Sequence, residues 1–130
     1  MVICLFGSTY VPDHDVALES SLDQILLPEL RKIDGFVSFH MYRAEDGEVL
    51  GVVRFDNRRA LESWRNDLTH RRVWEHAPTL YEHFWIQNCD TYREYGWARA
   101  AGRTGEDLRT RFAADPSNLA RALPTDRLPD

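Results

Sequence analysis

Residues 36–55, FVSFHMYRAEDGEVLGVVRF, decide the fold because they have the pattern of two strands joined by a tight turn. Successive residues of a strand point to opposite faces of a sheet. One face of the first predicted strand carries Phe36, Ser38, His40 and Tyr42. The other face carries Val37, Phe39 and Met41. Residues 44–48, AEDGE, supply the turn, and residues 49–55 return as the second strand.

The segment before this hairpin predicts one more strand and a helix. Residues 2–8, VICLFGS, form a short apolar run that is typical of a buried strand. Asp13 or Asp15 is placed to cap the helix that follows. The apolar face of this helix carries Leu22, Ile25, Leu26, Leu30 and Ile33. We expect Pro28 to kink or shorten the helix, and Asp34-Gly35 to end it with a turn.

The segment after the hairpin, residues 60–72 (ALESWRNDLTHRR), predicts two helices with a break between them. A continuous helix would turn His70 by about 240° away from Trp64, so their side chains would diverge. Residues 66–69 include poor helix formers, and Thr69 is a suitable N-cap for a second helix. We therefore expect a break near residues 67–69 that lets both side chains face one enclosed cavity.

The second of these helices completes the predicted topology. Its apolar stripe carries His70, Val73, Trp74, Ala77, Leu80, Tyr81 and Phe84, and we expect Pro78 to distort it. Residues 85–92, WIQNCDTY, then form the last strand. The order β-α-β-β-α-β predicts an α+β, ferredoxin-like domain over residues 1–97.

Composition restricts the class of protein. A chain of 130 residues that is 43% hydrophobic can form one compact domain with a core. The net charge of −5 argues against a nucleic-acid partner, which requires a basic surface. No apolar run approaches the roughly 18 residues of a membrane span, so we expect a cytoplasmic protein with no membrane partner. Cys4 and Cys89 lie in strand-like segments, which predicts buried, reduced thiols, and we expect no metal site.

Residues 98–130 differ in character from the rest and predict a C-terminal extension. They are charged and rich in small residues, with Phe112 as their one aromatic residue. The stretch Thr104–Asp107 is suited to cap a short helix that would end near Ala114. Beyond Pro116, the pattern is compatible with a docking arm or with a disordered one.

Four blocks of sequence resemble bacterial antibiotic biosynthesis monooxygenase domains, which belong to the dimeric α/β-barrel superfamily. They are IDGFVS (33–38), VRFDNRRALESWRN (53–66), HRR (70–72) and YREYGW (92–97), and the resemblance spans about residues 20–97. It implies a dimer of ferredoxin-like sheets packed face to face, with a pocket between the sheet and the helices of each subunit. Members of the family include oxygenases that use no cofactor and enzymes that degrade haem.

The resemblance also suggests which residues act. Trp64 matches the family's tryptophan, and His70 matches a polar residue that is a tyrosine in the cofactor-free oxygenases. We predict that both are catalytic, with His70 as a base whose pKa is close to the working pH. Ala60 departs from the pattern, since these oxygenases have asparagine there. The haem-degrading pattern fits worse, because this chain has Phe6-Gly7-Ser8 and Trp74 where it requires asparagine and histidine.

Further side chains are candidates for substrate binding: His40, Tyr42, Tyr81 and Trp74. Alternatives stay open for these residues and for the catalytic pair. A polar stripe such as that of His40 and Tyr42 commonly faces solvent rather than a pocket. Trp64 has the spacing of an ordinary packing residue, and His70 could bond a backbone group at the start of its helix.

These observations favour a cofactor-independent monooxygenase that acts on an aromatic or phenolic, polyketide-like intermediate. The alternatives are a cyclase or isomerase that works through an enolate, and a non-catalytic small-molecule binder or accessory protein. We expect no cofactor, because the chain lacks the glycine-rich fingerprint of a flavin or nicotinamide site. We also expect a homodimer, because the apolar stripe of Val37, Phe39 and Met41 would need cover on the second face of the sheet.

Overall fold

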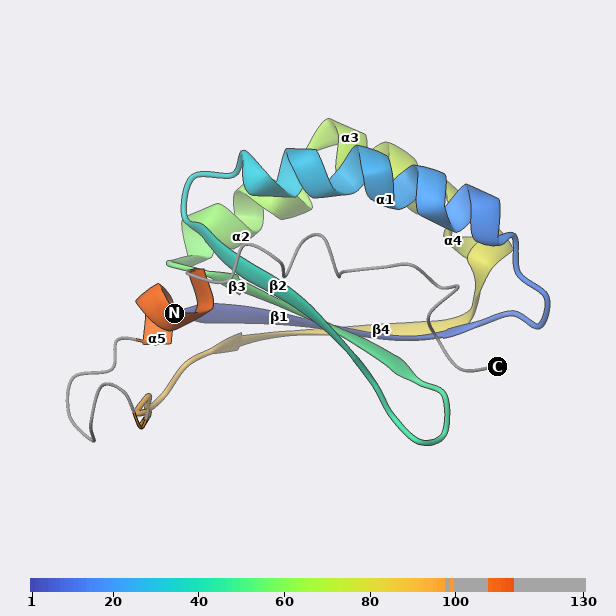
Figure 1. The fold of residues 1–130 in the computed structure, drawn as a ribbon. Helices are drawn as coiled ribbons and strands as arrows, with labels where there is room; N and C mark the ends of the chain where they lie inside the picture. The colour runs from blue at the N-terminus through green and yellow to red at the C-terminus, as the bar shows by residue number, and fades with distance from the viewer. Residues whose placement is uncertain (98, 100–107, 114–130) are drawn as a thin grey trace.

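The computed structural model describes residues 1–97, 99 and 108–113. Its order of elements confirms the predicted β-α-β-β-α-β, ferredoxin-like arrangement (Figure 1). The strands are β1 (Val2–Tyr10), β2 (Phe36–Arg43), β3 (Val49–Phe55) and β4 (Tyr81–Asp90). The helices are α1 (Val16–Arg31), α2 (Arg58–Arg65), α3 (Leu68–Val73), α4 (Ala77–Leu80) and α5 (Leu108–Ala113), with a 3-10 turn, η1 (Trp74–His76), between α3 and α4.

Within the described residues, the four strands form one antiparallel sheet in the order β2-β3-β1-β4. The helices α1 to α4 lie together on one side of this sheet, as Figure 1 shows. The core lies between the two layers and consists of Val2, Leu30, Val53, Phe55, Ala60, Leu61 and Trp64. No helix in the described part of the chain is long and apolar enough to cross a membrane.

Local capping explains where the helices begin. The Asp15 side chain accepts a hydrogen bond from the Leu18 amide at 2.9 Å, so it is the cap that begins α1. Asn57 caps α2 in the same way. Pro28 lies inside α1, which continues to Arg31, so the expected shortening is not observed. Gly35, with φ at +94°, makes the turn into β2, where a side chain would be strained.

Strand β2 contains an irregularity that the alternation of residues did not predict. Phe36 pairs with Phe55, but the next pair joins Ser38 to Arg54, so the register shifts between them. Phe36 and Phe39 therefore both pack against the core, although the alternation put them on opposite faces. The bulge brings Phe36 back to the face that the helices cover.

The last strand begins earlier than predicted. Tyr81 and Phe84, expected on a helix, belong to β4, and helical structure ends at Leu80. The reason is pairing, because β4 follows β1 along its whole length, from Tyr10 opposite Tyr81 to Val2 opposite Asp90. Pro78 lies in the first turn of α4, where proline is tolerated, rather than interrupting a longer helix.

The short helix α5 packs against β2 on the sheet face opposite the helical layer. The Arg54 guanidinium carbon lies 3.8 Å from the centroid of the Phe112 ring, and the His40 ring lies 6.1 Å from it. Arg109 forms an ion pair with Asp56. The predicted cap at Thr104–Asp107 and the segment beyond Pro116 lie outside the described residues.

The two cysteines are both free. Ile3 pairs with Cys89 and Cys4 pairs with Asn88, so the thiols belong to adjacent register positions on opposite faces of the sheet. Cys4 is partly buried, and burial raises the pKa of its thiol to about 11. Cys89 is exposed, contrary to the expectation that both thiols are buried.

Candidate functional site

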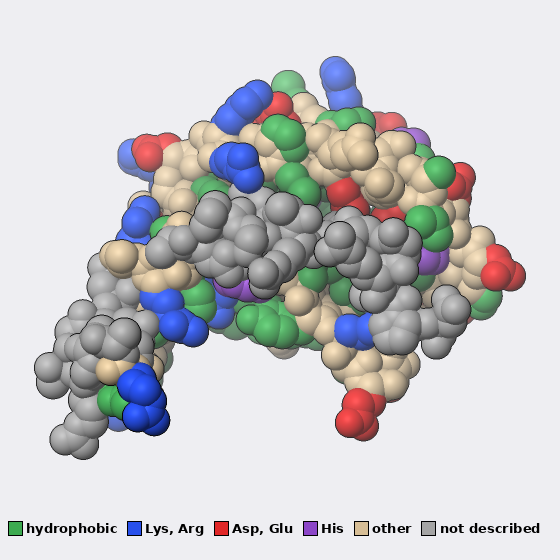
Figure 2. Space-filling model, viewed as in Figure 1, with side chains coloured by type: hydrophobic (Ala, Val, Ile, Leu, Met, Phe, Trp, Pro, Cys, Tyr) green, Lys and Arg blue, Asp and Glu red, His purple; other side chains and the backbone are tan. Residues whose placement is uncertain are grey.

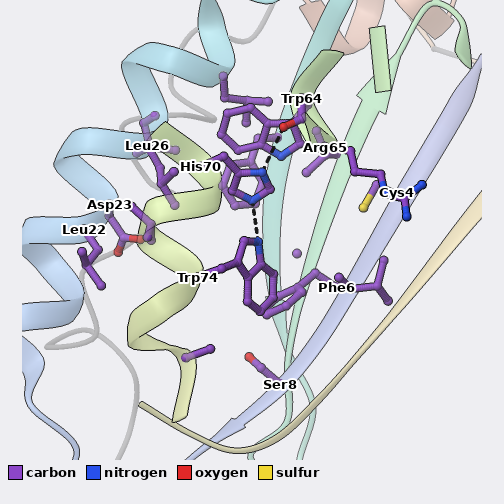
Figure 3. Close-up of a pocket in the computed structure, with 18 of the residues that line it drawn as sticks. Cys4, Phe6, Ser8, Leu22, Asp23, Leu26, Trp64, Arg65, His70 and Trp74 are labelled. Carbon is purple, nitrogen blue, oxygen red and sulfur yellow. Dashed lines mark hydrogen bonds between the residues drawn. The ribbon is translucent and has the colours of Figure 1, made fainter. Parts of the chain in front are cut away.

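A cavity of about 480 Å³ lies between the helical layer and the sheet. All four strands supply its floor, with Cys4, Phe6, Ser8, Tyr10, Phe39, Met41, Gly51, Val53, Tyr81, Ile86 and Asn88. Helices α1, α2 and α3 supply much of the opposite wall, as the close-up in Figure 3 shows. Most of the lining is apolar or aromatic, which suits a small organic ligand. Among the described residues, no group of three or more His, Cys, Asp or Glu side chains is arranged to hold a metal ion.

The break between α2 and α3 brings Trp64 and His70 together, as the sequence predicted. Helix α2 ends at Arg65, and Asp67 accepts a hydrogen bond from the His70 amide at 2.9 Å to begin α3. Asp67 rather than Thr69 is therefore the N-cap, because the chain turns two residues earlier than expected. The rings of Trp64 and His70 stack with centroids 4.0 Å apart and planes 14° from parallel, and both line the cavity.

Two hydrogen bonds hold the His70 imidazole in one protonation state. Its Nδ1 lies 3.0 Å from the Trp64 carbonyl oxygen, and the Trp74 indole N–H donates to its Nε2 at 3.0 Å (Figure 3). A carbonyl can only accept and an indole N–H can only donate, so Nδ1 carries the proton and Nε2 accepts. Burial lowers the pKa of His70, although the bond to Trp64 acts in the opposite direction. The site therefore presents a neutral imidazole.

The predicted substrate-binding residues divide into two pairs. Trp74 and Tyr81 line the cavity, and each makes an edge-to-face contact with Phe6, with centroids 5.6 Å apart. His40 and Tyr42 are not among the lining residues, because β2 contributes Phe39 and Met41 to the cavity instead. His40 lies beside Phe112 on the far face of the sheet. The structure thus does not bring His40 and Tyr42 to the site.

The same geometry corrects the argument for a dimer. Phe39 and Met41 were expected to form an apolar stripe on the uncovered face of the sheet. They line the cavity under the helices, and Val37 is only 5% exposed. These residues are therefore covered by the chain itself, so the stripe is not a reason for a second copy to bind.

Ala60 occupies the position where the cofactor-free oxygenases have asparagine. It is 1% exposed and belongs to the core rather than to the lining of the cavity. Its methyl group lies close to Gly35, because a Cβ atom added at Gly35 would come within 2.9 Å of the Ala60 Cβ. A larger residue at position 60 would therefore meet the turn before β2 and not a ligand.

Two acidic residues in the cavity were missed by the sequence analysis. Glu19 is only 3% exposed, and its Oε2 lies 3.1 Å from His14 Nε2. Asp23 lies one turn further along α1. Burial, together with the Glu19 carboxylate, raises the pKa of Asp23 to about 7. Acidic side chains also show among the apolar ones below the helical layer in Figure 2.

A signal for these residues was present in the sequence. Glu19 and Asp23 are four residues apart and share the helical stripe of Leu22, Leu26 and Leu30. Acidic residues in the apolar stripe of a helix are placed toward the core, where an unpaired charge is costly. The pattern could therefore have marked them as candidate site residues.

Comparison with solved structures confirms the predicted fold. The Mycobacterium tuberculosis protein Rv0793 matches with a TM-score of 0.63 and 22% identity, over 73% of this chain and 98% of that protein. A Deinococcus radiodurans protein provisionally named an antibiotic biosynthesis monooxygenase matches with a TM-score of 0.64 and 16% identity, over 75% of this chain and 99% of its own. A Nitrosomonas europaea protein of unknown function matches with a TM-score of 0.58 and 13% identity, over 75% and 94%.

These likenesses support the resemblance seen in the sequence at the level of the fold. Identities of this size do not transfer a reaction from one protein to another. No protein-family profile and no curated protein matches the chain. The chemistry must therefore be argued from the cavity itself.

Proposed function

We propose that the protein is a small cofactor-independent monooxygenase that oxidises a phenolic, polyketide-like intermediate in the cavity between sheet and helices. The observation that carries the proposal is the neutral His70 imidazole, hydrogen-bonded through Nε2 to the Trp74 indole N–H on the cavity wall. A base beside a hydrogen-bond donor is the arrangement that turns a bound phenol into a stabilised phenolate. The aromatic lining suits a planar ring system.

The proton step uses both hydrogen bonds of His70. The substrate hydroxyl replaces the Trp74 N–H as the partner of Nε2 and transfers its proton to that nitrogen. The Trp64 carbonyl continues to accept from Nδ1–H, which orients the ring and stabilises the imidazolium. The protonated Nε2 no longer accepts a hydrogen bond, so the Trp74 N–H is available to donate to the phenolate oxygen.

The oxidation step requires dioxygen as the only oxidant. An electron-rich phenolate transfers one electron to dioxygen, and the resulting ring radical and superoxide combine to form a carbon–oxygen bond. The His70 imidazolium returns its proton to the peroxide. The hydroperoxide then loses water, which consists of its outer oxygen atom, the returned proton and the hydrogen of the oxidised ring carbon. The oxygen atom that stays on the ring becomes a quinone carbonyl. The largely apolar lining limits contact of the reactive intermediate with water.

We also propose a homodimer, because apolar side chains lie on the sheet face that turns away from the cavity. Ile3 and Leu5 pair with Arg54 and Val52 across β3, so these side chains share the sheet face that turns away from the cavity. Ile3 and Leu5 are partly exposed, while α5 contacts β2. A second copy of the chain is the proposed cover for the rest of this apolar face.

The test is oxygen uptake with a hydroxylated anthrone as the probe, together with mass spectrometry of the product formed under ¹⁸O₂. We expect one labelled oxygen atom in each quinone. His70→Phe should lower the rate by roughly 10²- to 10⁴-fold, the usual share of general-base catalysis. His76→Phe, which alters an exposed histidine on η1, is the matched control and should retain the rate.

Other outcomes would replace this function with one of its alternatives. Turnover of the phenol without dioxygen would indicate a cyclase or isomerase that uses the same base. Tight binding of the probe with no turnover would indicate a non-catalytic binder. Full activity in His70→Phe would mean that His70 only packs against Trp64 and that another group accepts the proton.

A further inference from the structure

The part of the cavity beside α1 contains carboxylate oxygens that lack hydrogen-bond donors. Glu19 Oε1 and Asp23 Oδ2 are both buried and have no hydrogen-bond partner among the described residues, while the Tyr10 hydroxyl interacts with the Glu19 carboxyl group. Glu19 is 3% exposed, and both residues line the cavity. A buried carboxylate oxygen without a donor costs free energy unless a bound group satisfies it. The proposed oxidation at His70 makes no use of either residue.

Aromatic rings lie beside these carboxylates. Tyr10 and Tyr81 line the same cavity, with their rings stacked 5.2 Å apart. Phe6 contacts Tyr81, and Phe84 stacks on Phe6 with centroids 5.8 Å apart. The Tyr10 ring also stacks on the His14 ring, with centroids 4.2 Å apart, so its faces are taken up by neighbouring rings and this cluster forms an apolar wall beside the carboxylates. Asp23 and Tyr81 line the same cavity, and burial, followed by the charges of Asp23 and Glu19, raises the pKa of Tyr81 to about 12.

We infer that the ligand of this cavity carries a protonated amine, which binds between the Glu19 and Asp23 carboxylates and the rings of Tyr10 and Tyr81. An ammonium group has hydrogen-bond donors and no acceptors, which matches the oxygens of ionised Glu19 and Asp23, which can only accept. Its charge offsets the two acidic groups, and the aromatic wall beside them packs against its carbon atoms. A ligand carboxylate would meet two like charges at the same place.

The inference rests on the proposed function only in taking this cavity as the substrate site. It narrows the substrate class to aromatic compounds that carry a basic amine, and it holds whether or not the reaction consumes dioxygen. Binding measured without turnover therefore tests it separately from the oxygenase activity.

The affinity for an amine should depend on pH. The titratable and charged groups around this part of the cavity are Glu19, Asp23, His14, Tyr10, Tyr81, His70 and Arg71. Asp23 has a pKa raised to about 7, so it is largely neutral at pH 6 and ionised at pH 8. An aliphatic amine stays protonated over this range. Its affinity should therefore rise from pH 6 to pH 8, and its binding near pH 7 should release a proton from Asp23.

The experiment is isothermal titration calorimetry of the full chain at pH 8 with three probes of one size: 1-naphthylmethylamine, 1-naphthalenemethanol and 1-naphthoate. We expect the amine to bind roughly 10- to 100-fold more tightly than the alcohol, as a charge-assisted hydrogen bond allows. The naphthoate should bind most weakly. Glu19→Gln and Asp23→Asn should each remove most of the preference for the amine over the alcohol.

Glu29→Gln is the matched control, because Glu29 is on the same helix, pairs with exposed Lys32 and does not line the cavity. It should leave all three affinities unchanged. Equal affinities of the wild-type protein for the amine and the alcohol, or no measurable binding of the amine, would overturn the inference. This test does not depend on whether a variant folds. A retained preference without oxygen uptake would overturn the oxygenase and leave the amine site in place.

Discussion

The hydrogen bond between Trp74 and His70 can be tested through its effect on stability. His70→Phe keeps a ring that can stack on Trp64, but it removes both hydrogen bonds of the imidazole. Each such bond contributes about 1 kcal/mol. The Trp64 carbonyl keeps a second donor, the Asp67 amide at 3.1 Å, and the Trp74 N–H is left at the cavity wall. We therefore expect the free energy of unfolding to fall by about 1–3 kcal/mol.

A double-mutant cycle isolates the bond between the two rings. Trp74→Phe removes the donor and loses some packing, and the packing loss cancels in the cycle. If the bond forms, the double variant should be less destabilised than the sum of the single variants by about 1 kcal/mol. The assay is urea unfolding followed by far-ultraviolet circular dichroism at pH 8, where His70, with its lowered pKa, is neutral.

The control cycle pairs His70→Phe with Trp85→Phe. Trp85 hydrogen-bonds Glu48 and does not line the cavity, so its effect should add to that of His70 without coupling. If the effects of His70→Phe and Trp74→Phe also add to within about 0.3 kcal/mol, the proposed hydrogen bond between the two side chains is refuted. The Nε2 atom would then lack its orienting donor, and the proton route proposed for the oxidation would lose its geometric basis.

Three further results are expected. Gly7→Ala should destabilise the protein by about 1–3 kcal/mol, because an added Cβ would overlap the Trp85 indole, and Trp85→Leu should restore part of the loss in denaturant unfolding. The folded pKa of Asp23, about 7, exceeds the ordinary 3.8, so folding favours its protonation and its contribution to stability improves as pH falls from 8 to 5. Asp23→Asn should therefore be more stable than the wild type at pH 8, with a smaller gain at pH 5. Light scattering at micromolar concentration should give twice the chain mass of 15.2 kDa, and a monomer would contradict the proposed dimer.

Features set by neighbours in the chain were predictable. The caps at Asp15 and Asn57 and the break after Arg65 follow from side chains that bond amides within three residues of themselves. The convergence of Trp64 and His70 followed from that break, because helix geometry alone shows that an unbroken helix would separate them. Thr69 was a reasonable cap by type, but Asp67 was equally suitable and lies closer to the end of α2.

Features set by pairing between distant segments were not predictable. The start of β4 at Tyr81 depends on Tyr10 lying opposite it, and local periodicity continued the helix instead. The bulge between Phe36 and Ser38 depends on the register with β3. It returns Phe36 to the core, while His40 lies on the face where α5 packs. Alternation alone says which residues share a face, but not which face the helices cover.

The sequence by itself determined the order of the elements, the break between α2 and α3, and the identity of His70 and Trp64 as neighbours. Only the tertiary structure decided how the site is completed. Phe6 of β1 contacts both Trp74 and Tyr81, and Glu19 and Asp23 of α1 line the same cavity as Tyr81 of β4. Propensity and capping act over a few residues, whereas a cavity is enclosed by side chains from segments that meet only when the chain folds.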